Sequence, residues 1–298
     1  MRQRIITGII FTLVITAIVI PGYWLPSLLY AFYALLAFIL TRELQHTFVK
    51  AKIRVSPILP LFNTLIVLLP LLLARSSKFA AVGTGPLLIA ITALVCFFIL
   101  VAMGVLAVIQ LIAGSPQALP HAAVNALLTA YIAFPLSNPV IILTTVPDGY
   151  FWMLLGLITP WVSDTFAFFV GTMFGRHKIV PRLSPKKTIE GSIGGIMGTI
   201  LFVGLYFLVF MRESPTLNKL AGEHLLLIII AGTLFSVASQ MGDWLASAIK
   251  RWCGVKDFGT ILPGHGGILD RFDSVLFTMP VALMVTALAV FLFTKGSI

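Results

Sequence analysis

The chain has 298 residues, of which 59% are hydrophobic and 10% charged, and its formal net charge is +10. A mean hydropathy of +1.06 excludes an ordinary soluble domain, and apolar runs of about 20 residues, long enough to cross a bilayer, recur throughout. We therefore expect an all-α fold, a polytopic membrane bundle. The positive charge suits anionic lipid or a polyphosphate. Nucleic acid is a poor partner, because no basic soluble domain is present, and two cysteines support neither a disulfide framework nor a zinc site.

Nine candidate transmembrane spans are predicted in chain order. The first follows two arginines, as a signal peptide would, but no small-residue cleavage site comes after it, so we expect it to be retained. Pro135 and Pro139 interrupt the fifth, which is expected to form two half-helices or one bent span. The nine spans cover residues 5–20, 24–40, 58–74, 86–113, 121–146, 150–174, 191–211, 224–249 and 272–293.

The distribution of basic residues predicts the orientation of these spans. With the N-terminus in the cytoplasm and the C-terminus outside, fifteen of the 20 Lys and Arg residues fall inside, as the positive-inside rule requires. We expect an integral protein of a prokaryotic inner membrane, with its active site facing the cytoplasm. The five basic residues left outside are Arg75, Lys78, Arg212, Lys219 and Lys295.

The acidic residues divide the chain into two regions. Six of the ten lie in two short stretches, bounded by Asp164 and Glu190 and by Asp243 and Asp273. We therefore expect residues 1–146 to be a transmembrane scaffold, with oligomer contact or lipid access as alternative roles. Residues 147–298 are expected to form the catalytic transmembrane region, since ionisable groups in membrane segments are usually kept for function.

In the first stretch, Asp164 lies within an apolar run, where a carboxylate needs a cation, a metal or a water-filled cavity, or serves as a structural bond between helices. A loop then reads S-P-K-K-T from Ser184 to Thr188, just before a predicted helix. Two lysines and a hydroxyl at a helix N-terminus favour phosphate binding over an ordinary cytoplasmic loop. Glycines at 191, 194, 195 and 198 follow at four-residue spacing, which favours close helix packing over a phosphate cradle.

In the second stretch, Asp243, Ser247 and Lys250 share one helix face. Three glycines surround His265 and free the backbone for positive φ and close approach, whereas His265 itself is equally well explained as a surface donor. Asp270 and Asp273 are three residues apart at the start of the last span, so on one helix both would point the same way. Carboxylates of this kind suit Mg²⁺, although helix capping also explains Asp270.

The stretch from Ser247 to Asp273, SAIKRWCGVKDFGTILPGHGGILDRFD, resembles the signature of the phosphatidate cytidylyltransferases, or CDP-diacylglycerol synthases. Their pattern is S-x-x-K-R, four residues, K-D, and then P-x-H-G-G-x-x-D-R-x-D, from which this chain does not depart. Asp164 and the run from Ser184 to Gly191 resemble the family's second conserved region. The similarity covers roughly the last 140 residues; the first half resembles the family only in being a hydrophobic bundle.

The resemblance implies that CTP and phosphatidate react to CDP-diacylglycerol and pyrophosphate, in a membrane-embedded homodimer that uses Mg²⁺, with K⁺ as a candidate second cation. It implies a catalytic set of Asp243, Asp270, Ser247, Lys250 and Arg251, and metal ligands among Asp243, Asp270 and Asp273. The implied CTP- and phosphate-binding residues are Asp164, Ser184, Lys186, Lys187, Thr188, Lys256, His265, Gly266, Gly267 and Arg271. We expect Lys186 and Lys187 to hold CTP, and Lys250 and Arg251 to hold the lipid phosphate.

Other functions fit the sequence less well. A CTP-dependent enzyme acting on an ether-lipid phosphate or a polyprenol remains an alternative. An ion-coupled transporter would also bury acidic groups, but it favours pseudo-symmetric halves, and these halves differ sharply. A lipid-binding scaffold explains the basic loops but not the carboxylates among them. The D-G-x-x-A-R motif of the CDP-alcohol phosphatidyltransferases is absent.

Overall fold

The computed structural model describes residues 2–75, 84–112, 118–146, 148–181, 184, 186–210 and 225–295. Within these ranges every regular element is a helix, and the only β-pairings are two isolated bridges. The expected all-α class is therefore confirmed for the described residues. Three of the basic residues that we expect outside the membrane, Lys78, Arg212 and Lys219, lie outside the described ranges.

Six of the described helices are long and apolar enough to cross a membrane. They are α2 (Pro26–Lys50), α6 (Ala118–Thr145), α7 (Gly149–Phe174), α8 (Ile189–Phe210), α10 (Leu225–Trp252) and the pair α11 (Leu269–Phe272) and α12 (Val275–Lys295). The helices α1 (Arg2–Gly22), α3 (Leu59–Ala74) and α5 (Thr84–Ile112) supply shorter apolar stretches within the described residues. The chain is a polytopic helical membrane protein.

Two predicted spans differ from the structure. The fifth is one continuous helix, α6, with Pro135 and Pro139 inside it, so the alternative of two half-helices is wrong. Burial explains this tolerance, because 72% of the apolar window of α6 lies inside the structure and packed neighbours stabilise an interrupted helix. The last span begins three residues later than predicted, because α11 ends at Phe272 and the long helix α12 begins at Val275.

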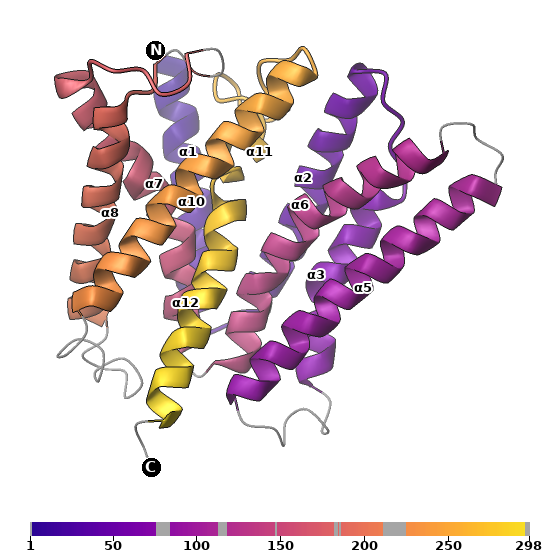
Figure 1. The fold of residues 1–298 in the computed structure, drawn as a ribbon, viewed down its shortest axis with the longest axis horizontal. Coiled ribbons are helices and arrows are strands. Elements are labelled where there is room, and N and C mark those ends of the chain that lie inside the picture. Colours follow the sequence, from indigo (N-terminus) through magenta and orange to yellow (C-terminus); the bar gives the residue numbers. More distant parts are fainter. Residues whose placement is uncertain are drawn as a thin grey trace. The chain divides into compact units, whose positions relative to one another are not determined.

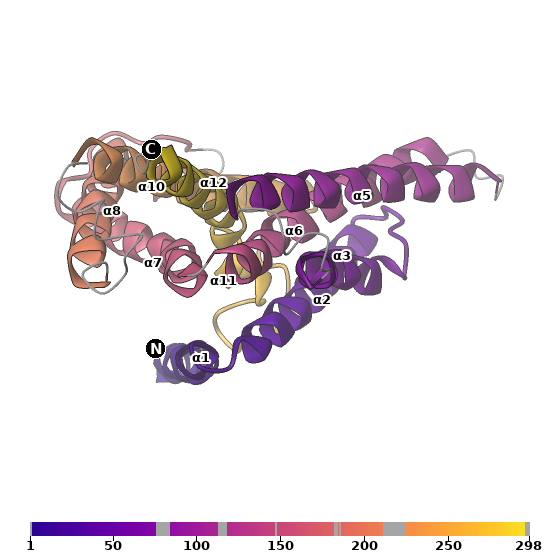
Figure 2. The same ribbon diagram turned by 90° about the horizontal axis from the view of Figure 1, so that it is seen from below.

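The chain forms two compact units. The first contains Met1–Thr145 together with Lys250–Phe272, and the second contains Val146–Ile249 together with Asp273–Ile298. In the first unit, α6 packs against α5, α3 and α2, while α11 contacts α2 (Figures 1 and 2). The signature from Ser247 to Asp273 is called the second motif below. Most of it, residues 250–272, therefore belongs with the N-terminal helices rather than with its neighbours in sequence.

In the second unit, α7 packs against α8 and α12 (Figure 1). The glycines of α8 make this contact close. A Cβ on Gly191 would lie 2.7 Å from the Ala167 carbonyl oxygen of α7, and one on Gly195 would lie 3.1 Å from the Ser163 carbonyl oxygen. The predicted packing role of these glycines is confirmed.

A buried polar network joins three helices of the second unit. The Ser163 hydroxyl of α7 lies 2.8 Å from that of Ser236 on α10, and the Gln240 amide donates to the Ser236 oxygen at 3.1 Å. The Ser192 hydroxyl of α8 donates to the Gln240 side-chain oxygen. Hydrogen bonds of this kind between apolar helices fix their register, and one turn after Gln240 the same helix presents Asp243.

Candidate active site

The second unit contains a cavity of about 590 Å³ between α7, α8, α10 and the loop before α8. Six of the predicted site residues line it, one from α7, one from α10 and four from the S-P-K-K-T loop: Asp164, Asp243, Ser184, Lys186, Lys187 and Thr188. Thr188, the last residue of the S-P-K-K-T loop, and Asp243 are 55 residues apart in the sequence, so tertiary packing brings them into one cavity.

An ion pair between Lys187 and Asp243 marks this cavity. Their side chains are 28% and 27% exposed, so the pair is partly desolvated but remains open to a ligand. The Lys187 ammonium also lies 5.8 Å from the centre of the Trp244 ring, which adds a cation–π contact. On the next turn the Ser247 hydroxyl lies 3.5 Å from an Asp243 carboxylate oxygen, as their predicted shared face requires.

Helix capping fixes the loop before α8. The backbone N–H of Gly191 donates to the Thr188 hydroxyl at 3.2 Å, which makes Thr188 the N-cap of this helix. Glu190 accepts from the backbone N–H groups of Arg176 and His177, and one of its oxygens lies 2.6 Å from His177 Nδ1. These bonds tie both ends of the loop together, so Lys186 and Lys187 are held at a positive helix end.

In the first unit, Asp270 organises the second motif. One carboxylate oxygen accepts a hydrogen bond from the Lys250 ammonium at 2.8 Å. The other accepts the backbone N–H groups of Phe258 and Gly267, both at 2.9 Å. Its side chain is 6% exposed and that of Lys250 is 13% exposed, so this is a buried pair with three donors on one carboxylate. Lys250 further lies 5.2 Å from the Phe258 ring centre.

The glycine-rich part of this motif adopts the backbone that its residues predict. Gly264 and Gly266 have φ values of +78° and +81°. A Cβ on Gly266 would lie 2.7 Å from an Asp270 oxygen, so a side chain there would displace the carboxylate. Arg271 closes the turn, because its guanidinium donates to the His265 carbonyl oxygen at 2.8 Å and 3.2 Å. In this structure Arg271 therefore stabilises the loop itself.

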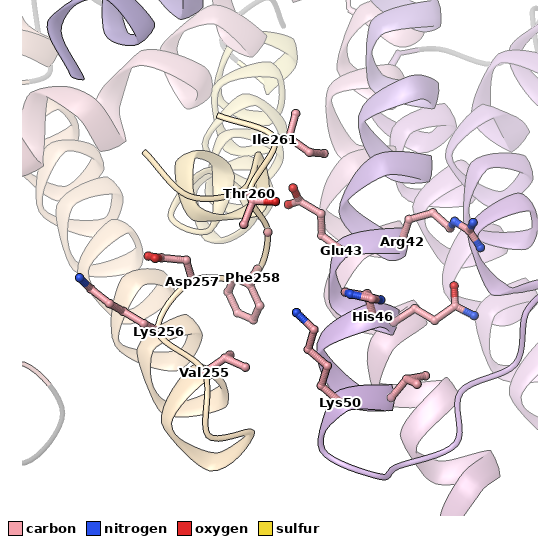
Figure 3. Close-up of a pocket in the computed structure, with 13 residues that line it drawn as sticks. Arg42, Glu43, His46, Lys50, Val255, Lys256, Asp257, Phe258, Thr260 and Ile261 are labelled. Carbon is pink, nitrogen blue, oxygen red and sulfur yellow. The ribbon is translucent and has the colours of Figure 1, made fainter. Parts of the chain in front are cut away.

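A second cavity, of about 740 Å³, lies in the first unit between α2 and residues 255–261. Figure 3 shows His46 and Lys50 of α2 on the side that faces Asp257 and Phe258. Lys256 also lines this cavity, whereas the Arg251 side chain is exposed and its nearest polar contact is the Val255 carbonyl oxygen at 3.4 Å.

Asp273 does not share a helix with Asp270. It follows the end of α11 and belongs to the second unit, so the expectation that both point the same way on one helix is wrong. Its carboxylate accepts the backbone N–H of Ser274 at 2.7 Å. A short polar side chain that bonds its neighbouring backbone competes with helix formation, and it ends α11 before α12 begins.

The carboxylates fit magnesium by their chemistry. Mg²⁺ prefers one or two carboxylates, with phosphate and water completing the octahedron. Asp243 lines the cavity of the second unit, where Lys187 is its ion-pair partner. Asp270 has about four lone-pair sites, of which three are used. Among the described residues no group of three or more His, Cys, Asp and Glu side chains gathers as a metal cluster. Asp243 and Asp270 belong to different units, so one shared ion stays a prediction.

Two residues that shape these sites are not among those predicted from the sequence. Gln240 lines the cavity of the second unit. Glu43 on α2, in the region expected to be scaffold, bonds the backbone of the second motif at Ile268 and Leu269. Glu43 is the only acidic residue before Asp148, and this isolation is the one signal in the sequence that points to it.

Comparisons with known proteins agree with the motifs. The profile of the cytidylyltransferase family matches residues 2–289. A Bacillus subtilis protein named phosphatidate cytidylyltransferase is 33% identical over 291 residues, which cover 97% of this chain and 98% of the relative. Proteins of the same name from Thermotoga maritima and Staphylococcus haemolyticus are 45% and 41% identical over 132 and 135 residues. In those two matches the chain spans about half the length of the relatives, 47% and 48%.

Proposed function

Because the chain belongs to the cytidylyltransferase family, we propose that it is a phosphatidate cytidylyltransferase. It transfers CMP from CTP to phosphatidate and releases pyrophosphate, which supplies CDP-diacylglycerol for phospholipid synthesis. The observation that carries this proposal is the cavity in which the S-P-K-K-T loop and Asp243 meet. Cations, hydroxyl groups and a helix N-terminus all bind phosphate favourably, and this cavity is lined by all three.

The reaction requires little acid–base chemistry from the protein. An oxygen of the phosphatidate phosphate attacks the α-phosphorus of CTP, the new P–O bond forms, and the bond to the bridging oxygen of the β-phosphate breaks. The phosphatidate phosphate is already anionic at neutral pH, so no strong base is needed. The difficulty is repulsion between two polyanions, and positioning with electrostatic stabilisation overcomes it.

The residues divide this work between them. Lys186 and Lys187 lie in the cavity of the second unit and bind the phosphates of CTP, with Ser184 and Thr188 beside them. Lys250 and Arg251 meet the phosphate of the lipid. Lys250 is already paired with Asp270, so the exposed Arg251 is the first contact for that phosphate. Lys250 acts closer to the loop of residues 253–268 between α10 and α11, called the motif loop below.

The proposed reaction uses magnesium, which carboxylates would bind. Asp243 and Asp270 are its protein ligands, with Asp273 as a third candidate, and K⁺ is a candidate second cation. When bound, the ion neutralises charge on the phosphates of the two substrates. Lys187 and Lys250 pair with these same carboxylates in the structure, so they orient the two carboxylates.

The proposed topology has nine spans with the N-terminus inside and the C-terminus outside, which sets the active site at the cytoplasmic face of a prokaryotic inner membrane. Its support is the excess of Lys and Arg on one side. A membrane-impermeant thiol reagent should label an Arg75→Cys variant in intact cells and an Arg54→Cys variant only after permeabilisation; the reverse pattern would invert the topology. A homodimer is also proposed, and a mass measurement in detergent that gives one chain would exclude it.

Asp243→Asn tests the assignment most simply, since it removes one charge and keeps the side-chain shape. We expect turnover of CTP and phosphatidate to fall by about 100-fold or more, the order found when one preorganised electrostatic contact is lost. Asp148→Asn is the matched control, because Asp148 lies in the same unit but lines neither cavity. If Asp243→Asn turns over near the wild-type rate while remaining folded, the proposed role of this cavity is wrong.

A further inference from the structure

Glu43 is a buried carboxylate in the C-terminal half of α2, one of the helices long and apolar enough to cross a membrane. Glu43 is 6% exposed. Its two carboxylate oxygens accept hydrogen bonds from the backbone N–H groups of Ile268 at 2.9 Å and Leu269 at 2.7 Å. Both N–H groups lie at the start of α11. The first turn of a helix leaves its backbone N–H donors without partners inside the helix, so they need an acceptor from elsewhere. Burying a carboxylate inside a protein is costly unless it is hydrogen-bonded, which argues for a specific task.

The backbone on both sides of the motif loop is shaped to admit this side chain. A Cβ on Gly267 would lie 2.6 Å from each Glu43 carboxylate oxygen, and a Cβ on Gly259 would overlap the same carboxylate. One turn further along α2, the Thr47 hydroxyl donates to the Phe258 carbonyl oxygen at 3.1 Å. Helix α2 therefore holds the loop at Phe258 and again at Ile268 and Leu269.

The same loop holds Asp270 from its other side. Phe258 and Gly267 donate their backbone N–H groups to Asp270, and Asp270 in turn binds Lys250. Phe258 is thus bonded to α2 by its carbonyl and to Asp270 by its N–H. Any shift of the loop away from α2 moves both donors that orient the Asp270 carboxylate.

We propose that Glu43 is a positioning residue for catalysis, which sets the place of Asp270 and Lys250 by anchoring the motif loop to α2. The inference rests on the proposed function for its catalytic part. It also gives the N-terminal region a role in the site beyond scaffold. Glu43 touches no substrate in this account and acts through the backbone of Ile268 and Leu269.

The chemistry of the two bonds explains why a carboxylate is used. Each oxygen accepts one N–H, and both remain acceptors while the group is ionised. A glutamine has one acceptor oxygen and would turn N–H donors toward the second N–H. Aspartate keeps two acceptors, but its chain is shorter by one methylene and cannot reach both donors from the same helix position.

Glu43→Gln should lower kcat by about tenfold to 100-fold, the usual cost of losing a group that orients a metal or substrate ligand. The Michaelis constant for CTP should change far less, because the cavity of the second unit is untouched. Hydrogen exchange in residues 257–272 should become faster, and this readout does not depend on activity. If wild-type protein shows no transferase activity, the proposed function fails, and exchange alone still tests the anchor.

Thr41→Val is the matched control on the same helix. The Thr41 side chain is fully buried and accepts a hydrogen bond from the Asn63 amide at 3.0 Å, away from the motif loop. Its loss should lower the melting temperature while leaving kcat and exchange of residues 257–272 unchanged. If Glu43→Gln behaves like Thr41→Val, with reduced stability and a normal kcat for the folded fraction, Glu43 is only structural and the proposal is overturned.

A double-mutant cycle provides a second test. Gly259→Ala alone should reproduce much of the kcat loss, because its methyl group pushes the Glu43 carboxylate off its two donors. In the background of Glu43→Ala the same methyl group meets no carboxylate, so the double variant should be no slower than Glu43→Ala by itself. Additive losses in the double variant would contradict contact through Glu43.

Discussion

At the scale of single residues, the two proposed metal carboxylates share one arrangement. Asp243 pairs with Lys187 in the second unit, and Asp270 pairs with Lys250 in the first. The pairs differ in burial, because Asp243 is 27% exposed whereas Asp270 is 6% exposed. A partly exposed pair can open to admit a phosphate, whereas a buried pair that accepts three hydrogen bonds orders the backbone around it.

Replacing Lys186 and Lys187 together by alanine should raise the Michaelis constant for CTP more than that for phosphatidate. Both lysines line the cavity with Thr188, and neither belongs to the motif loop of the first unit. The loss of two charge-assisted contacts to phosphate should raise that constant about tenfold or more. Steady-state kinetics with each substrate varied in turn gives the answer.

Arg54→Ala is the control for this double variant. It removes a cation from another loop, and Arg54 lines neither cavity. It should leave both Michaelis constants unchanged. A larger rise for phosphatidate than for CTP in the double lysine variant would exchange the two substrate assignments.

At the scale of helices, small residues decide how closely the second unit packs. A Cβ on Gly232 of α10 would lie 2.6 Å from the Ile200 Cα of α8. This Cα is a backbone atom, so no change of side-chain rotamer can relieve the overlap. A Cβ on Gly204 of α8 would meet only Ile228 at 3.6 Å, an ordinary contact. The same substitution should therefore have opposite effects at these two positions.

Gly232→Ala should destabilise the protein by about 1–3 kcal/mol, the usual cost of overpacking, and so lower its melting temperature. Gly204→Ala should keep or raise the melting temperature, because alanine favours a helix by about 1 kcal/mol over glycine. Thermal unfolding of both variants in one detergent makes the comparison. Equal melting temperatures would mean that α8 and α10 do not pack as closely as the structure shows.

Local patterns in the sequence predicted much of this architecture and part of the site. Apolar length predicted the helices, and spacing predicted the helix start after Thr188, the glycine packing and the positive φ of Gly264 and Gly266. Spacing did not predict the break between α11 and α12, because it depends on the bond that the Asp273 carboxylate accepts from the Ser274 backbone. Nor could it predict the bond from Glu43 to Leu269, which joins residues 226 apart and depends on tertiary packing.

At the scale of the whole molecule, the second motif is divided between two compact units. Ser247 and Asp273 belong to the second unit, and Lys250 to Phe272 belong to the first. Along the chain the unit first changes after Thr145, and the segment 250–272 returns to the N-terminal helices. The expected division into a scaffold region and a catalytic region at residue 146 stays a prediction. Both compact units therefore hold residues of the proposed active site.

The central claim is that this protein joins the CMP of CTP to phosphatidate with magnesium present. Purified full-length protein in detergent, given labelled CTP, phosphatidate and Mg²⁺, should place the label in a lipid-soluble CDP product and release an equal amount of pyrophosphate. Omitting phosphatidate or chelating the metal should stop both. Label transfer to an ether-lipid phosphate or a polyprenol but not to phosphatidate, or turnover unchanged by chelation, would contradict the account.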